Sequence, residues 1–262
     1  MKRIFTKSRQ SGFSLVELLT ALCIFLVICG AAFALLGASQ KRFQSDSQLL
    51  NSFQEARLGM DQMVRDINDS GFPTPGYFAT VNSTNATQYA ATPFAWSPVG
   101  ANCQIGTTCV SPGEFDLIVE TNIDPVNSSQ VSWIRYQLVG TILYRGISPV
   151  VAGADPTTDT GLAQAMAPYV QNVMNNASGA QIAHFQAYYP GMFPGGNAVP
   201  LFSYICDSST GPQSCISLGG APQNIRDVSV TLIVASSMPD DQTGQPRLVQ
   251  LTGRGRRMNP NQ

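Results

Sequence analysis

Apolar and polar residues divide this chain of 262 residues into three parts. Residues 1–12 contain no acidic residue and four basic ones, namely Lys2, Arg3, Lys7 and Arg9. Residues 13–36 are mostly apolar, and a helix of about 20 such residues is long enough to span a bilayer. From residue 71 onward, short stretches of alternating apolar and polar residues predict strands. The pattern therefore predicts a basic segment, an apolar helix and a β-rich head.

The helical pattern continues beyond residue 36, but its apolar residues narrow to one face. They recur at alternating steps of four and three, as in an amphipathic helix, at Leu49, Phe53, Ala56, Met60, Met63 and Ile67. Gly71 and Pro73 then supply the residues that commonly follow a helix end. One helix over 13–69 would be about 85 Å long. Its first half needs lipid or other helices around it, and its second half needs a domain to pack against.

Small residues interrupt the apolar half of this helix. Gly30 and Gly37 weaken the helix locally and would allow it to bend. Gly30, Ala34 and Ala38 follow one another at steps of four, which would let a second helix approach closely. The same residues also fit a surface that faces lipid, and both interpretations stay open.

The region 71–262 is expected to form one β-rich extracytoplasmic head. It begins with a long loop over 72–112, and a short helix is expected over 162–177. Gly140 and Thr141 form a hairpin turn. Strands are expected over 115–120, 131–139, 142–145, 181–189, 201–206, 225–236 and 247–252. The predicted class is α+β, with the long helix of segment 13–70 packed on an antiparallel sheet.

One acidic residue stands near the start of the apolar segment. Burying the carboxylate of Glu17 in a membrane costs on the order of a few kcal/mol, which makes it a functional candidate. A buried charge is tolerated when an opposite charge meets it in a low-dielectric environment. We therefore expect Glu17 to meet a positive partner.

The sequence Gly12-Phe13-Ser14-Leu15-Val16-Glu17-Leu18 resembles the processing signal of type IV pilins and pseudopilins. The resemblance implies that a prepilin peptidase removes residues 1–12 as a leader and methylates the new N-terminal Phe13. It also implies that Glu17 pairs with the N-terminal amine of a neighbouring subunit during assembly. The implied fold is the type IV pilin fold.

Further motifs indicate a subgroup. Segment 56–67, followed by Ser70-Gly71-Phe72, resembles the end of the long helix in PilW-like minor pilins, and Leu143-Tyr144-Arg145 is similar to a hairpin strand found there. The resemblance implies a minor pilin that initiates or caps a filament. The arginine–aspartate step at Arg65 and Asp66 also resembles J-type pseudopilins of type II secretion systems, which is the first alternative. A membrane-anchored extracytoplasmic adhesin or binding module is the second.

The charge distribution bears on location and partners. Basic residues before an apolar helix predict a leader in the cytoplasm, a single pass through the bacterial inner membrane and a periplasmic head. The resemblance then places the processed protein in a pilus at the cell surface, with other major and minor pilins. Loss of the leader removes four of 15 basic residues, which leaves 11 against 16 acidic ones and a net charge near −5. No nucleic acid and no small-molecule substrate is expected.

A secretory signal peptide is a rival interpretation of the same N-terminal segment. Its basic start and apolar stretch would be similar, and Ala32, Ala34 and Ala38 could supply a small-residue cleavage site. This interpretation gives Glu17 no role, and the helical pattern continues beyond such a cut.

The six cysteines form two groups. Cys23 and Cys29 lie in the apolar helix as small hydrophobic residues. The other four allow three disulfide connectivities. We favour the local pairs because each flanks a compact turn-rich segment, in an oxidising compartment such as a periplasm; these pairs are Cys103–Cys109 and Cys206–Cys215. A zinc site needs closer pairs than these spacings supply, and four reduced thiols remain an alternative.

Enzyme, metal and cofactor chemistry find little support in the sequence. The single histidine, His184, lies in a predicted strand, and no Gly-x-Ser-x-Gly nucleophile motif is present. The aspartates at 155, 159, 240 and 241 do not match a calcium-binding loop. The run 253–257, with three arginines, could contact a phosphate surface but is more typical of a solvated tail. We expect no catalytic, cofactor or metal residues.

Overall fold

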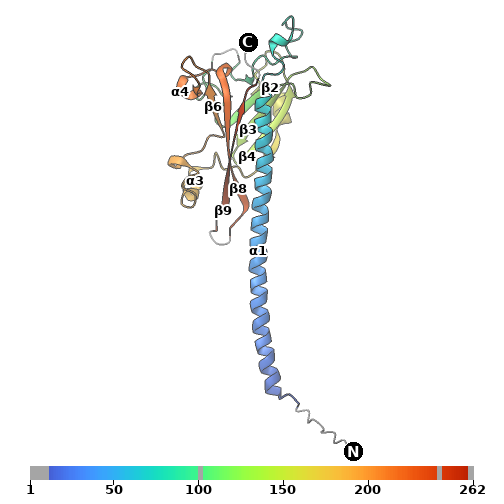
Figure 1. The fold of residues 1–262 in the computed structure, drawn as a ribbon, viewed down its shortest axis with the longest axis vertical. Helices are drawn as coiled ribbons and strands as arrows, with labels where there is room; N and C mark the ends of the chain where they lie inside the picture. Colours follow the sequence, from blue (N-terminus) through green and yellow to red (C-terminus); the bar gives the residue numbers. More distant parts are fainter. Residues whose placement is uncertain (1–11, 100–102, 241–243, 259–262) are drawn as a thin grey trace, which may run out of the picture.

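The structure, a computed structural model, describes residues 12–99, 103–240 and 244–258. Figure 1 shows a head of two β-sheets from which one long helix projects, so the fold is α+β and consistent with the type IV pilin fold. This helix, α1 (Leu15–Asn68), has 54 residues and follows the predicted length closely. Asp69 caps its end, and Gly71 has a φ of 79° that favours glycine.

The head contains two antiparallel sheets. The first has the order β1-β2-β3-β4-β5 and the second the order β7-β6-β8-β9. Their strands are β1 (Phe94–Ala95), β2 (Asp116–Thr121), β3 (Ser132–Val139), β4 (Ile142–Pro149), β5 (Ala167–Val170), β6 (Phe202–Cys206), β7 (Gln213–Ser214), β8 (Ile225–Pro239) and β9 (Pro246–Arg256).

Short helices fill the connections between these strands. Three are α-helices and three are 3-10 turns: α2 (Thr160–Ala165), α3 (Gly179–Gln186), α4 (Cys215–Leu218), η1 (Pro75–Tyr77), η2 (Pro194–Gly196) and η3 (Pro222–Asn224). The predicted loop over 72–112 is largely irregular and contains only η1 and the two-residue β1 as regular elements in its described part.

The core lies where the second half of α1 meets both sheets. The predicted apolar stripe faces inward, because Ala56, Met60, Met63 and Ile67 are all buried. They pack in one cluster with residues of β2, β3, β6 and β8. Figure 1 shows the helix running along β8 and β9 before it leaves the head.

Glycines on β9 allow this close approach. A Cβ atom at Gly253 would lie 2.7 Å from Met60 Sδ. A Cβ atom at Gly255 would lie 2.5 Å from Ile67 Cγ2. Real side chains do not make such short contacts. Because Gly253 and Gly255 have no side chain, the helix packs directly on the backbone of β9. The glycines of the run 253–257 thus have a packing role, and residues 253–256 of the run belong to β9 rather than to the solvated tail expected from the sequence.

Two predicted elements of the head were wrong in whole or in part, and the strands predicted over 142–145 and 247–252 are longer in the structure, as β4 and β9. Residues 181–189, predicted as a strand, contain α3 instead. A capping box starts this helix: Ser178 N–H donates to Gln181 Oε1 at 3.1 Å, and Ser178 Oγ accepts from Gln181 N–H at 3.4 Å. Only the first part of 162–177 is helical, because Pro168 favours extended backbone at the residue before it, and the chain enters β5.

Candidate assembly interface

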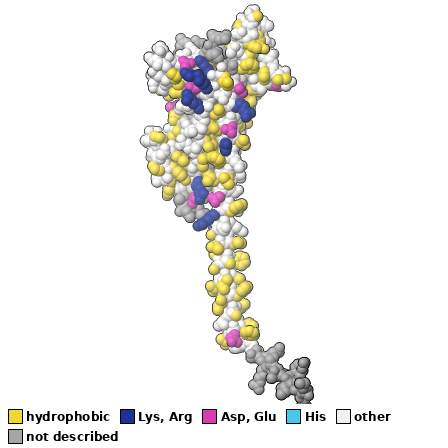
Figure 2. Space-filling model, in the orientation of Figure 1, with side chains coloured by type: hydrophobic (Ala, Val, Ile, Leu, Met, Phe, Trp, Pro, Cys, Tyr) yellow, Lys and Arg dark blue, Asp and Glu magenta, His cyan; other side chains and the backbone are white. Residues whose placement is uncertain are grey.

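The first half of α1 has no protein cover. None of residues 15–44 is buried, and the apolar side chains from Phe13 to Phe43 stand in solvent, with Phe13 87% exposed. Figure 2 shows this stalk as a nearly continuous apolar surface below the head. Within the described residues, α1 is the one helix long and apolar enough to cross a membrane. Such a surface needs lipid or other helices around it.

The expected cleavage site lies just before the helix. Gly12, Phe13 and Ser14 have no helical structure and are exposed. An atom added at the Cα of Gly12 would meet nothing within 4 Å. The rest of the expected leader, residues 1–11, lies outside the described residues. The peptide bond between Gly12 and Phe13 is therefore accessible to another protein.

Glu17 lies in the first turn of α1, and its side chain accepts a hydrogen bond from a backbone N–H group at the start of the same helix. Its Oε2 accepts a hydrogen bond from Ser14 N–H at 3.0 Å, and Thr20 Oγ donates to its backbone carbonyl at 2.9 Å. A negative charge at this end is favoured by the helix dipole. In the described ranges Glu17 forms no ion pair, so its carboxylate is available to a cation that another molecule brings. Figure 2 shows an acidic group at this end of the stalk.

The small residues of the stalk face open space. A Cβ atom at Gly30 or Gly37 would meet nothing within 4 Å. The glycines do not interrupt α1, which stays helical through both positions. The surface around them is therefore free for another helix or for lipid.

Polar contacts mark the place where the head begins to hold α1. Arg247 of β9 forms an ion pair with Asp46 at 2.8 Å and a second one with Asp240. Ser237 Oγ donates to Gln48 Oε1 at 2.7 Å. The contacts of Asp46 and Gln48 are exposed, so each contributes little to stability, whereas Asp240 is buried. They separate the bare half of the helix from the packed half.

A buried polar network fixes the other end of α1 to the first sheet. Asp66 Oδ2 accepts from Tyr136 Oη at 2.6 Å and from Arg145 Nη2 at 2.8 Å. Arg145 Nε also donates to Tyr136 Oη at 2.8 Å, and Gln62 Nε2 donates to Asp66 Oδ1 at 2.7 Å. Burial and the charge of Asp66 raise the pKa of Tyr136, which keeps its hydroxyl protonated as a donor. Sequence reasoning did not predict that Asp66 and Arg145 meet.

Both local disulfides favoured from the sequence are present in the structure. Cys103 pairs with Cys109, and Cys206 pairs with Cys215. The second pair is fully buried and joins the end of β6 to α4. Cys23 and Cys29 are free thiols on the stalk. The four head cysteines therefore leave no set of thiolates for zinc.

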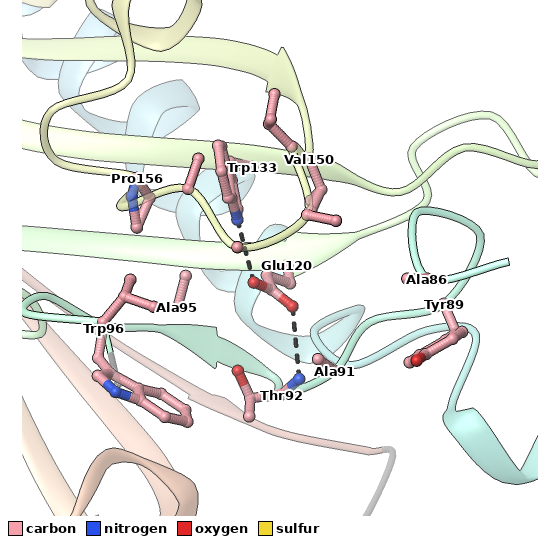
Figure 3. Close-up of a pocket in the computed structure, with 15 residues that line it drawn as sticks. Ala86, Tyr89, Ala91, Thr92, Ala95, Trp96, Glu120, Trp133, Val150 and Pro156 are labelled. Atoms are coloured by element: carbon pink, nitrogen blue, oxygen red, sulfur yellow. Dashed lines mark hydrogen bonds between the residues drawn. The ribbon is translucent and has the colours of Figure 1, made fainter. Parts of the chain in front are cut away.

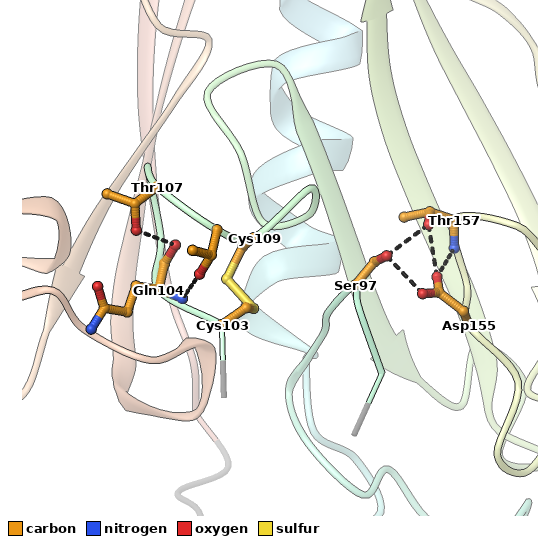
Figure 4. The surroundings of a disulfide bond; sticks show 8 residues. Ser97, Cys103, Gln104, Thr107, Cys109, Asp155 and Thr157 are labelled. Carbon is orange, nitrogen blue, oxygen red and sulfur yellow. Dashed lines mark hydrogen bonds between the residues drawn. A yellow bond between two sulfur atoms is a disulfide. The ribbon is translucent and has the colours of Figure 1, made fainter. Parts of the chain in front are cut away.

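The first disulfide loop packs on α4 and on Gly220, which follows it. Ile105, inside the first loop, is buried, and its N–H donates to the carbonyl of Gly220 at 3.1 Å. A Cβ atom at Gly106 would lie 3.0 Å from Cγ1 of Ile216 in α4. Figure 4 shows the first disulfide beside a separate polar cluster, in which Ser97 Oγ donates to Asp155 at 2.7 Å.

The remaining chemical candidates lie apart from one another. His184 is exposed on α3, where the sequence predicted a strand, and its ring contacts Tyr188. The side chains of Asp155 and Asp159 cap local turns and α2, and Asp241 lies outside the described residues. Among the residues that the structure describes, no group of three or more His, Cys, Asp or Glu side chains could hold a metal.

The arginines of the run 253–257 are held by acidic neighbours. Arg254 donates to Asp227 at 2.7 Å, and Arg257 lies 3.5 Å from Asp207. Arg257 also donates to the carbonyl of Gln223 at 2.9 Å. The run is therefore neutralised in part by the head itself.

Comparison with known proteins identifies one feature. Residues 7–33 match the model of the prokaryotic N-terminal methylation motif. No curated protein and no solved structure gives a significant match to the chain. The motif supports a type IV pilin-like or pseudopilin role, in which the protein is a structural subunit anchored by its apolar helix and associated with other pilins.

Proposed function

We propose that the protein is a minor subunit of a type IV pilus, cleaved after Gly12 and N-methylated at Phe13. One observation carries the proposal: an apolar stalk without protein cover starts with a carboxylate, Glu17, that has no cationic partner in the described chain. A membrane anchor alone has no use for this carboxylate. A filament subunit has one, because each new neighbour brings a positively charged N-terminal amine.

The physical sequence of events follows from this arrangement. The precursor lies in the inner membrane with residues 1–12 in the cytoplasm and residues 71–262 in the periplasm. Cleavage creates the charged amine of Phe13. During assembly this amine pairs with Glu17 of an adjacent subunit, so that both charges are neutralised inside the apolar core of the filament. The stalk leaves lipid for other stalks, and its apolar surface stays covered throughout.

The head supports a minor rather than a major subunit. It contains about 190 of the 262 residues, with long loops and two disulfides. A repeating shaft subunit is more compact. Such a head fits a position where it has few neighbours, as in the initiation or capping of a filament.

The N-terminal residue and mass of the mature protein test the processing step. We expect a chain that begins at Phe13 with one added methyl group. A start at any other residue, or a start at Phe13 without methylation, would count against the processing that we propose.

Substitution of Glu17 tests assembly separately from processing. Glu17→Ala should leave cleavage intact and strongly reduce the number of filaments on cells. Glu55→Ala is the matched control, because Glu55 is an exposed carboxylate on the same helix at the level of the head. Normal filament numbers in Glu17→Ala would contradict the assembly role.

A J-type pseudopilin of a type II secretion system is the alternative, favoured by the step Arg65-Asp66 at the helix end. Deletion of the gene separates the two, since a pilin deletion affects pili and a pseudopilin deletion affects secreted proteins. An anchored adhesin of a different class would assemble with neither system, and its stalk would not crosslink to the helices of other pilins.

A further inference from the structure

A pocket in the head combines aromatic walls with one buried carboxylate. Its volume is about 260 Å³, and it lies between the loop 86–99, strands β2 and β3, and the loop 150–156. Figure 3 shows Glu120 at its centre, with Trp133, Trp96 and Tyr89 around it. Val99 and Val151 on its rim are 45% and 49% exposed, so the pocket opens to solvent. Nothing in the proposed filament role uses this pocket.

Glu120 is unusual for its surroundings. Of the fifteen described residues that line the pocket, it alone carries a charge. The residue is only 8% exposed, and in the described ranges it forms no ion pair. A carboxylate buried without a counter-charge is costly, and proteins commonly pair it or bind a cation at it. Burial raises the pKa of Glu120, against opposing hydrogen bonds from Trp133, Thr92 and Ala91.

The neighbours of Glu120 position its carboxylate but leave part of it available. Trp133 Nε1 donates to Oε1 at 3.0 Å, and the N–H of Thr92 approaches Oε2 at 3.4 Å. A carboxylate has about four acceptor sites. The strong bond from Trp133 fixes the orientation of the group, and the long bond from Thr92 is easily replaced. The backbone of Ala91 also contributes to holding the group, and Oε2, which receives the longer of the bonds from Trp133 and Thr92, is the atom that an entering donor would meet.

The aromatic residues favour the same kind of ligand. A cation is attracted to the faces of Trp and Tyr rings within about 6 Å, most strongly when water is excluded. The other walls are small and apolar, with alanines, valines and a proline. They would accept a short hydrocarbon body but offer no further charged partner to it.

We propose that this pocket binds a small organic cation that carries an ammonium group on a short apolar body. The ammonium group would donate to Glu120 Oε2 and lie between the rings of Trp96 and Trp133. The apolar body would contact the alanines and valines of the wall. An ammonium ion thereby supplies the missing counter-charge, and a neutral alcohol of the same shape would not.

The protein contains its own reporter for this site. The chain has two tryptophans, and both line the pocket. Tryptophan fluorescence of the full chain in a non-ionic detergent therefore reports directly on occupancy. The probe is n-pentylammonium, and 1-pentanol is its uncharged counterpart. We expect a saturable fluorescence change with n-pentylammonium and an affinity about tenfold or more lower for 1-pentanol.

Two variants keep the proposal falsifiable. Glu120→Gln retains the shape of the side chain and should weaken n-pentylammonium binding about tenfold or more. Trp96→Leu alters a half-buried wall residue, leaves Trp133 as reporter and should weaken binding as well. Thermal unfolding checks that each variant is folded. Equal affinity for amine and alcohol, or unchanged binding in folded Glu120→Gln, would overturn the proposal, as would the lack of any saturable response in the unmodified protein.

Discussion

Residues 15–44 and residues 45–68 belong to one uninterrupted helix, yet their surroundings differ completely. In the first segment no side chain is buried, although most are apolar. In the second segment the buried apolar side chains lie on one face, and this half of the helix packs against β8 and β9. The packed half contributes to the stability of the head, whereas the bare half can contribute only when something outside this chain covers it.

The two halves of the helix differ in what can hold their side chains in place. Positions in the packed half are fixed by contacts within the chain, such as the approach of Ile67 to Gly255. Positions in the bare half have no such contacts in the described chain, and in the proposed filament partners would hold them, with Glu17 as the one acidic residue among them. Substitutions should therefore act on folding in one half and on assembly in the other.

The largest effect on folding is expected at the buried network. Asp66→Ala leaves Arg145 without its carboxylate partner, and loss of one member of a buried pair costs about 3 kcal/mol or more. Asp61→Ala is the matched control, since Asp61 is exposed on the same helix. Denaturant unfolding of the full chain with its disulfides intact measures both variants. Equal effects of the two variants would show that the network does not hold the helix to the head.

A somewhat smaller effect on the free energy of unfolding is expected at the contact between α1 and β9. Gly255→Val would place side-chain atoms against Ile67 and push the helix outward, at a cost of about 1–3 kcal/mol. Gly179→Ala is the control, because a Cβ atom there meets nothing within 4 Å. The unfolding free energies of both variants decide the matter. A Gly255→Val protein as stable as the unmodified protein would argue against close helix–sheet contact.

A moderate and pH-dependent effect is expected at Glu120. Its pKa in the folded head is raised above the usual 4.5, so the folded state holds the proton more tightly than the unfolded state. The free energy of unfolding should therefore fall as pH rises from about 4.5 towards the folded pKa. Glu120→Gln should remove this slope when unfolding is measured between about pH 4 and 7. A slope unchanged in the variant would mean that other groups cause it.

The free energy of unfolding is expected to change with pH in the opposite direction at Asp155. Desolvation opposes ionisation of Asp155, but hydrogen bonds from Thr157 and Ser97 outweigh it and lower its pKa below 3.8. Its stabilising contribution should be present above that pH and decline as pH falls through the folded pKa. Asp155→Asn should thus reduce stability near neutral pH and lose this effect in acid. A variant as stable as the unmodified protein at neutral pH would contradict this assignment.

The smallest effect on folding is expected in the bare half of the helix. Leu26→Ala removes a side chain that is 60% exposed, so the free energy of unfolding of the head should change by less than about 0.5 kcal/mol. The buried Met63→Ala should instead cost about 2–5 kcal/mol. For each kcal/mol of stability lost, Leu26→Ala should reduce the number of filaments on cells more than Met63→Ala does. A large loss of head stability in Leu26→Ala would contradict the division of the helix.

Much of the fold could be predicted because its signals are local. The apolar stripe of α1, its stop near Gly71, the hairpin at Gly140 and the alternating strand at 225–236 each depend on neighbouring residues. The motif from Gly12 to Leu18 is equally local. For these elements, residue periodicity and turn chemistry point to the same structure as tertiary packing does.

The rest could not be predicted because it depends on contacts between distant parts of the chain. Asp66 and Arg145 are 79 residues apart, and their pairing follows from the docking of α1 on the first sheet. The pocket at Glu120 joins four separate segments, two loops and two strands, for the same reason. At 181–189 a strand was predicted, but the capping box at Ser178 and the spacing of Ile182, Phe185 and Tyr189 favour a helix.

The central claim is that the bare half of α1 is covered by the helices of other subunits. A photo-crosslinking residue at position 26, with peptide mapping by mass spectrometry in cells that make filaments, tests this claim most directly. We predict crosslinks to the N-terminal helices of other pilin subunits, and none of these at position 58, which is exposed at the level of the head. Crosslinks from position 26 to lipid alone, in cells with normal filaments, would contradict the account.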